Sequence, residues 1–445
     1  MNKQTGFKNK YVLGISFISA LGGYLFGFDF AVISGALPFL QKQFAFSSYW
    51  EGFATGILAI GAIAGCILAG RVADKYGRRP GLMLAASLFA ASSLAMALAP
   101  TRDFFLVARF AAGAGVGMAS MLSPMYISEI APAAIRGRLV AMNQLTVVLG
   151  ILITNFVNYY WLRNLGVDAW RYMFGFGIIP SGLFLLGTYF LPESPRWLVN
   201  NNLEIRAEIV LSKIGDSVFV RESITMIKGS LSGAANINYA ALLKRAMLPA
   251  VLTGIGLAVF QQFCGINTVF NYAPKIFQSI GASQDDQLLQ TVFIGSVNLV
   301  FTVVAMLLVD RLGRKPLMLI GAGGLAILYV FIVSALHANA GVVSVLLLAA
   351  IGTYAMTLAP VIWVLIAEIF PSKIRSAAIT VAVVSLWMAY FILVFTFPVL
   401  FEHLKENTFY IYAGICAGGF FFVLFRIRET KGKTLEEVEQ AMTMH

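Results

Sequence analysis

Long apolar runs recur along the whole chain, and they constrain its fold more than any other feature. The 445 residues are 59% hydrophobic and only 12% charged, about half the charged fraction of an ordinary soluble protein. Each run is long enough to cross a bilayer as a helix, so we predict an all-α membrane protein with twelve transmembrane helices. The predicted spans are residues 11–40, 52–70, 81–100, 104–125, 139–162, 171–191, 248–279, 287–309, 316–338, 341–369, 374–400 and 408–426.

Basic residues are placed unevenly between these spans. The net charge of +11 comes from short clusters in the connecting segments, a placement that argues against nucleic-acid binding. Most of the 32 Lys and Arg residues fall on the side that contains the N-terminus, so the positive-inside rule predicts that both termini are cytoplasmic. The bases on the other side are Lys42, Arg102, Arg163, Arg171, Lys275 and Lys405.

Three short motifs occur once in each half of the chain, in the same order. They are Asp74–Pro80 and Asp310–Pro316, Glu129–Pro132 and Glu368–Pro371, and Glu193 and Glu429. Such repeats are typical of transporters with two related halves and a site between them near mid-membrane. We therefore predict two pseudo-symmetric six-helix halves, at residues 1–192 and 247–428. An intracellular helical linker at 193–246 and a cytoplasmic tail at 429–445 complete the predicted domains.

The repeated motifs all lie at predicted cytoplasmic ends of spans, where their acids and bases can pair. We expect these pairs to tie the two halves together when a central cavity opens outward, and to break when it opens inward. An exposed single pair contributes only about 0–1 kcal/mol, so a network is required; the alternative is that the loop charges only fix topology. The predicted cytoplasmic gate residues are Arg71, Asp74, Arg78, Glu129, Arg136, Glu193, Asp310, Arg311, Arg314, Glu368, Arg375 and Glu429.

Two ionisable residues, Asp29 and Arg109, lie well inside apolar runs. A lone charge there is costly, and charged groups inside a membrane usually mark ion or substrate pathways. The rise of a helix places both residues in the outer half of the membrane, so we expect them to pair. We predict that the pair couples transport to protons as Asp29 gains and loses a proton. The alternative is a static buried ion pair that only aids assembly.

The chain resembles a known family in several motifs. They are the segment GGYLFGFD at 22–29, the paired Asp-x-x-Gly-Arg motifs, PESPRW at 192–197, Gln261–Asn267 and the closing Glu429–Gly432. Together they resemble the sugar porters of the major facilitator superfamily, along essentially the whole chain. The resemblance implies a major facilitator fold, alternating access and a monosaccharide site between the halves. Symporters of this family carry an aspartate where Asp29 stands and facilitators carry a neutral residue, which implies proton symport.

A sugar site needs amides, which both donate and accept hydrogen bonds, and an aromatic surface. By resemblance, five amides match sugar-contacting positions: Gln144, Gln261, Gln262, Asn267 and Asn298. The predicted aromatic residues are Phe26, Trp363 and Trp387. In a straight helix Gln262 and Asn267 face about 140° apart, so they converge only if the helix bends or unwinds near Gly265. The alternatives are hydrogen bonds between helices for the amides and ordinary packing for the aromatic residues.

The sequence departs from the family pattern around this predicted site. Asn271 replaces a tyrosine and Tyr390 replaces an asparagine. Leu386 replaces an amide, Ala359 a glycine, and Ile151 the second glutamine of bacterial xylose symporters in the fifth span. The identity of the sugar is therefore not predicted.

These observations favour a secondary active transporter that imports a monosaccharide, a hexose or a pentose, by proton symport. A passive facilitator is the main alternative; a sugar sensor is less favoured because only a short tail follows the last span. An enzyme is not expected, because no phosphate loop, metal cluster or nucleophile with a base is present. Cys66, Cys264 and Cys416 have no paired spacing, so no metal site, disulfide or cofactor is predicted. We expect a monomer in the lipid bilayer of a bacterial inner membrane.

Overall fold

The computed structural model describes residues 9–132, 135–232, 242–245, 247–338, 341–370 and 374–431. Within these ranges every regular element is a helix. Eleven stretches are long and apolar enough to cross a membrane, and the last of them, Ala377–Arg426, contains two helices. Each of the twelve predicted spans therefore corresponds to helical structure.

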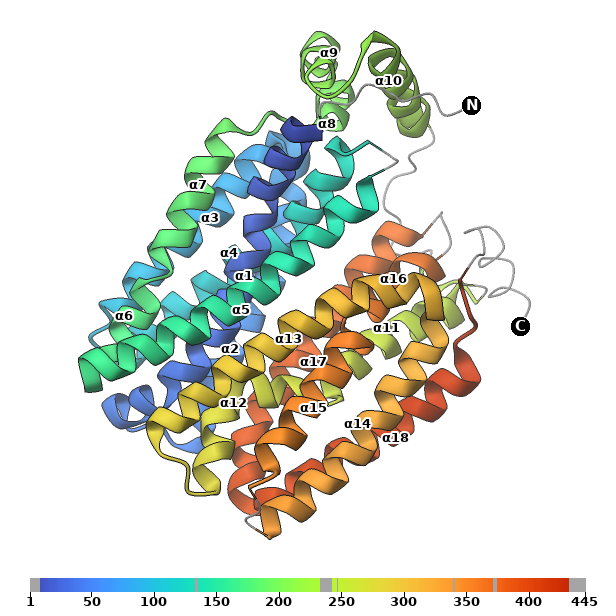
Figure 1. Cartoon of the computed structure of the whole chain (residues 1–445). Coiled ribbons are helices and arrows are strands. Elements are labelled where there is room, and N and C mark those ends of the chain that lie inside the picture. The colour runs from blue at the N-terminus through green and yellow to red at the C-terminus, as the bar shows by residue number, and fades with distance from the viewer. Residues whose placement is uncertain are drawn as a thin grey trace. The chain divides into compact units, whose positions relative to one another are not determined.

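The helices are labelled in Figure 1. In the first part of the chain they are α1 (Asn9–Phe44), α2 (Ser48–Tyr76), α3 (Arg78–Ala97), α4 (Arg102–Ile130), α5 (Arg136–Leu165), α6 (Ala169–Gly175), α7 (Ile178–Phe190), α8 (Pro195–Asn200), α9 (Glu204–Ser212) and α10 (Ser217–Ser232). In the second part they are α11 (Leu248–Phe263), α12 (Ile266–Ser279), α13 (Gln284–Leu312), α14 (Arg314–His337), α15 (Val343–Met356), α16 (Leu358–Ile369), α17 (Arg375–Leu404) and α18 (Thr408–Arg426).

Three of the predicted spans are broken into two helices each. The sixth consists of α6 and α7, the seventh of α11 and α12, and the tenth of α15 and α16. The seventh is interrupted at Gly265, whose φ of 86° lies in the left-handed region that glycine adopts without strain. Irregular backbone at membrane depth is tolerated where protein surrounds it or it lines a cavity, so this break marks a position of interest.

The chain forms two compact units. The first comprises residues 1–29, 61–150 and 174–235. In it, α3 packs closely against α4 and α7, and the fully buried rings of Phe89, Phe105, Phe174 and Phe184 contribute to the core. The short helices α8, α9 and α10 lie side by side beyond the end of α7 (Figure 1). They fall within the predicted linker, whose placement on the cytoplasmic face stays a prediction.

The second unit comprises residues 30–60, 151–173 and 236–445. Its helices pack mainly as the pairs α14 with α18, α11 with α17, and α13 with α15. Parts of α1, α2 and α5 belong to this unit, and Asn155 of α5 donates to the Thr291 carbonyl of α13 at 2.7 Å. The units therefore do not follow the predicted division after residue 192. That division describes chain topology, and it stays a prediction.

Candidate functional site

The structure brings together the predicted pair Asp29 and Arg109. Nη1 of Arg109 donates to Oδ1 of Asp29 at 3.3 Å, and Nη2 lies 3.2 Å from Oδ2. Both side chains are fully buried. Two contacts from a planar guanidinium to one carboxylate make a strong, directional pair, in which each buried charge neutralises the other.

Aromatic rings lie beside this ion pair. The guanidinium of Arg109 lies 6.0 Å from the centre of the Phe174 ring, and Phe105 packs edge-on against Phe174 at 5.2 Å. Among the described residues, Oδ2 of Asp29 accepts no hydrogen bond, so the ionic contact with Arg109 is the main interaction that stabilises this atom. Breaking such a pair without a compensating change leaves a buried charge, which costs several kcal/mol. A proton on Asp29 would remove that cost.

The helix break at Gly265 brings two predicted amides into contact. Nδ2 of Asn267 donates to Oε1 of Gln262 at 2.5 Å, which confirms the predicted convergence across the break. Asn271 donates in turn to the carbonyl of Asn267 at 2.7 Å, and the Tyr390 hydroxyl donates to Oδ1 of Asn271 at 3.2 Å. A continuous polar chain thus runs from α11 through α12 to α17.

Gln261 lies next to this chain and presents an unused acceptor. Its Nε2 donates to the carbonyl of Ala359 in α16 at 3.3 Å. Its Oε1 is buried and has no hydrogen-bond partner among the described residues. Buried polar atoms are nearly always paired, so an unpaired acceptor beside an amide cluster suits a ligand hydroxyl.

The other predicted sugar-site residues are less closely grouped. Trp387 is buried and lies edge-on to the Tyr390 ring at 5.9 Å. Asn298 is buried in α13, whereas 43% of Trp363 in α16 is exposed. Phe26 and Gln144 belong to the first compact unit and are partly exposed. Sugar contact by all these residues stays a prediction.

The relation between Asn271 and Tyr390 was not predicted from the sequence. Each residue is a separate departure from the family pattern, but the structure joins them by a hydrogen bond. Their reversed residue types, an amide where a tyrosine was expected and a tyrosine where an amide was expected, were the available signal. The Phe30 ring packs on Tyr390 at 4.9 Å, so the pair also contacts the residue that follows Asp29 in α1.

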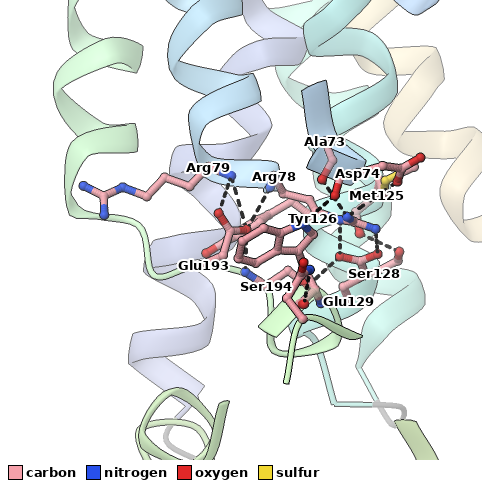
Figure 2. Close-up of polar contacts among 12 residues, drawn as sticks. Ala73, Asp74, Arg78, Arg79, Met125, Tyr126, Ser128, Glu129, Glu193 and Ser194 are labelled. Carbon is pink, nitrogen blue, oxygen red and sulfur yellow. Dashed lines mark hydrogen bonds and ion pairs between the residues drawn. The ribbon is translucent and has the colours of Figure 1, made fainter. Parts of the chain in front are cut away.

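Figure 2 shows the first copy of the repeated charged motif. Arg78 donates to both carboxylate oxygens of Glu129, at 2.9 and 3.0 Å. Glu193 accepts from the backbone N–H groups of Arg78 and Arg79, at 2.8 and 3.2 Å, at the start of α3. An anion is favoured at a helix N-terminus. We call the contact of Glu193 with these two N–H groups the N-terminal clasp.

The second copy repeats this geometry. Glu429 accepts from the backbone N–H groups of Arg314 and Lys315, both at 3.0 Å, at the start of α14. We call this the C-terminal clasp. The preceding glycines, Gly77 and Gly313, have φ of 106° and 94°, and a Cβ at Gly77 would collide with the carboxylate of Glu193. Glycine is thus required in each motif for two reasons, conformation and close approach.

These contacts include one of the expected acid–base pairs, Arg78 with Glu129, and otherwise differ from the expected pairing. The clasps use backbone N–H groups instead of arginine side chains, and the Arg78–Glu129 ion pair joins helices of the same predicted half. The reason is geometric, because each clasp acid follows a helix that packs beside the N-terminus that it accepts from. Arg71, Asp74, Arg136 and Arg311 are exposed. The side chains of Asp310, Glu368 and Arg375 lie outside the described residues, so pairing between the halves stays a prediction.

The pKa values of the two clasp acids shift in opposite directions. Burial of the carboxyl raises the pKa of Glu193, although N–H groups of Ser194, Arg78 and Arg79 act against it. Burial also acts to raise the pKa of Glu429, but N–H groups of Lys431, Arg314, Lys315 and Thr430 outweigh it, so its pKa lies below the usual range. The clasps therefore share a geometry and differ in electrostatics.

Comparison with known proteins places the chain in a family. The model of the family described as sugar (and other) transporter matches residues 15–442. A D-xylose-proton symporter of Escherichia coli is 38% identical, over 98% of this chain and 96% of its own length. The inward-open structure of the xylose transporter from E. coli has a TM-score of 0.86 at 37% identity, covering 97% of this chain and 100% of that one.

A second solved structure bears on the fold class. It is a proton:xylose symporter of the major facilitator superfamily bound to 6-bromo-6-deoxy-D-glucose, with a TM-score of 0.82 at 38% identity. It covers 98% of this chain and 100% of its own. The predicted major facilitator fold, with twelve helices in two halves, is confirmed by this likeness. The chain belongs to the family of sugar (and other) transporters.

Proposed function

We propose that this protein imports a monosaccharide into the cell by proton symport. The observation that carries this proposal is the two-contact ion pair between Asp29 and Arg109, fully buried among apolar and aromatic side chains. A passive carrier has no need of an ionisable carboxyl at that position. The similarity to a D-xylose-proton symporter supports the same conclusion.

Protonation of Asp29 changes how firmly Arg109 is bound. With Asp29 ionised, the pair is electrically balanced and Arg109 has a fixed partner. With Asp29 protonated, the carboxyl loses its charge, and the attraction that fixes the guanidinium falls steeply in a low-dielectric site. Arg109 is then able to take another arrangement. A transporter couples two solutes when both favour the same conformational change, so the proton and the sugar drive one transition together.

The amide chain supplies the sugar side of the coupling. Gln262, Asn267 and Asn271 carry donors and acceptors on two short helices that meet at a break. The Oε1 atom of Gln261, which has no hydrogen-bond partner among the described residues, adds a further acceptor. Sugar hydroxyls both donate and accept, so a ligand of this class fits a cluster of mixed amides. We infer that these residues bind the sugar and that Trp387 packs against its C–H face.

The membrane placement follows the charge pattern. The chain is a multi-pass membrane transporter of a family with bacterial members. We propose that both termini face the cytoplasm, since most connecting segments rich in Lys and Arg lie on that side. We further propose that a single copy of the chain is the functional unit.

Transport by purified protein in vesicles tests proton coupling. On addition of sugar to wild-type vesicles that contain a pH dye, we expect protons to move with the sugar. The D29N variant, which is always neutral at this position, should lose sugar-driven proton movement and keep sugar exchange between equal pools. D103N is the matched control, because Asp103 is an exposed acid that pairs with its neighbour Arg102. Sugar uptake by the wild type without proton movement would contradict the proposal and favour a facilitator.

A further inference from the structure

A second ion pair with little exposure joins α2 to α12. The carboxylate of Glu51, in the first turn of α2, contacts Nζ of Lys275 in α12. Only 2% of the Glu51 side chain and 23% of the Lys275 side chain are exposed. Both residues belong to the second compact unit. Lys275 is one of the bases predicted to face outside. Glu51 precedes the predicted second span, and no role was predicted for it.

A kink in α12 lies between Lys275 and the amide cluster. Within α12, Tyr272 has non-helical φ and ψ of −124° and 18°, and Pro274 removes a backbone donor. These two features divide α12 into an inner turn, which carries Asn267 and Asn271, and an outer segment at 274–279. The Tyr272 hydroxyl donates to the Val394 carbonyl in α17 at 2.6 Å, which fixes the kink against a neighbouring helix.

A small cavity lies beside the ion pair. It has room of about 20 Å³ and is lined by residues of α1, α2 and α12, among them Ser34, Gln41, Glu51, Asn271 and Gln278. This is enough for about one water molecule. Asn271 therefore contacts the amide chain on one side and this cavity on the other. Pro274, Lys275 and Gln278 of the outer segment of α12 line this cavity.

We propose that the Glu51–Lys275 ion pair is a latch that positions the outer segment of α12 and closes the sugar site toward the outside. The latch rests on the proposed function, since it supplies one of the two closures that alternating access requires. Two partly dehydrated charges are stable only together, because loss of one partner strands the other. The pair therefore separates only when water reaches both groups, which is the condition that opening of the outer side creates.

Another ion pair in the same compact unit provides the contrast. Arg163, at the end of α5, and Asp285, at the start of α13, approach to 3.4 Å, but 60% and 46% of their side chains are exposed. It too joins a helix of the first part of the chain to one of the second part. Exposed pairs of this kind contribute about 0–1 kcal/mol. The latch function is thus assigned to the buried pair and not to every ionic contact in the same unit.

Chemical labelling tests the latch. In the variant S34C, the new thiol lines the closed cavity, where Ser34 is 1% exposed. On the S34C background in detergent, we expect E51Q to raise the rate of reaction with a bulky maleimide by about tenfold, which corresponds to roughly 1.4 kcal/mol. The charge reversal E51K/K275E should return the rate to about that of S34C alone. R163Q should leave it unchanged. The buried native cysteines Cys66, Cys264 and Cys416 give the background, measured without S34C.

The outcomes separate the latch from a general packing role. If E51Q fails to fold, judged by size-exclusion chromatography, K275Q tests the same contact from the other helix. An unchanged labelling rate in a folded E51Q or K275Q variant would overturn the proposal. So would failure of the charge reversal to restore the rate, because a packing role does not depend on which partner carries which charge. The assay needs neither sugar nor a proton gradient, so its result is independent of the Asp29 test.

Discussion

At the scale of single residues, the hydrogen bond between Asn271 and Tyr390 turns two departures from the family pattern into one feature. The resemblance leads one to expect a tyrosine on α12 and an amide on α17. This chain has the amide on α12 and the tyrosine on α17, with Tyr390 Oη 3.2 Å from Oδ1 of Asn271. An exchange of this kind conserves the total side-chain volume, which cores tolerate best. It changes the shape offered to a ligand beside the amide chain.

The hydrogen bond between Asn271 and Tyr390 predicts strong energetic coupling between these two positions. N271Y places two tyrosines together and overpacks the contact, while Y390N leaves a cavity and an unpaired amide. We expect each single variant to weaken sugar binding by about tenfold, whereas the double exchange N271Y/Y390N recovers most of the affinity. Residues in direct contact typically show interaction energies of about 0.5–3 kcal/mol. Sugar titration followed by Trp fluorescence measures the four dissociation constants. If the changes in binding free energy of the two single variants simply add in the double variant, the predicted coupling is wrong.

At the scale of elements, the break between α11 and α12 determines the geometry of the amide cluster. Gly265 has φ of 86°, and a Cβ there would lie 2.5 Å from Cγ of the Tyr412 ring. The break allows Asn267 to reach back to Gln262, five residues earlier. A continuous helix would turn these side chains about 140° apart. The break between the two helices therefore sets the geometry of the amide cluster.

Replacing Gly265 tests that dependence. G265A combines an unfavourable positive φ with a steric collision, so we expect transport to be lost and Tm to fall by several degrees. G281A is the matched control, because Gly281 has a similar φ of 81° but open space around its Cα. It should show only the smaller cost of the backbone conformation and keep transport. Equal losses in both variants would mean that the collision with Tyr412 does not matter.

The elements also show what the sequence could predict and why. The break at Gly265 was predictable, because a glycine lay between two amides that a straight helix could not bring together. The breaks in the sixth and tenth spans were not, since an apolar run fits a straight and a broken helix equally well. Glu51 precedes the predicted second span, so the burial of its side chain could not be predicted from the sequence. Its contact with Lys275 depends on packing between helices that are distant in sequence. Local hydrophobic periodicity does not report such packing.

At the scale of the whole molecule, the internal repeat gives two clasps with one geometry. In each, an acid that follows a span accepts from two backbone N–H groups at a helix start behind a glycine of positive φ. The repeat predicted the matching acids but not their environments. Glu193 is more enclosed, and burial raises its pKa, whereas four N–H donors lower the pKa of Glu429. Symmetry in sequence therefore does not imply equal response to pH.

Opposite pKa shifts predict opposite pH trends for the neutral variants. Because the pKa of Glu193 is raised in the folded protein, the folded state binds a proton more readily than the unfolded chain does. Glu193 therefore contributes more to the stability of the folded state as the pH falls toward the ordinary pKa of a glutamate. A lowered Glu429 pKa does the reverse, and its contribution, complete near neutral pH, is lost on acidification. From pH 7 to about pH 4, the Tm difference between wild type and E193Q should therefore grow, while that between wild type and E429Q shrinks. Thermal unfolding at one scan rate measures both; parallel trends would show that the two clasps titrate alike.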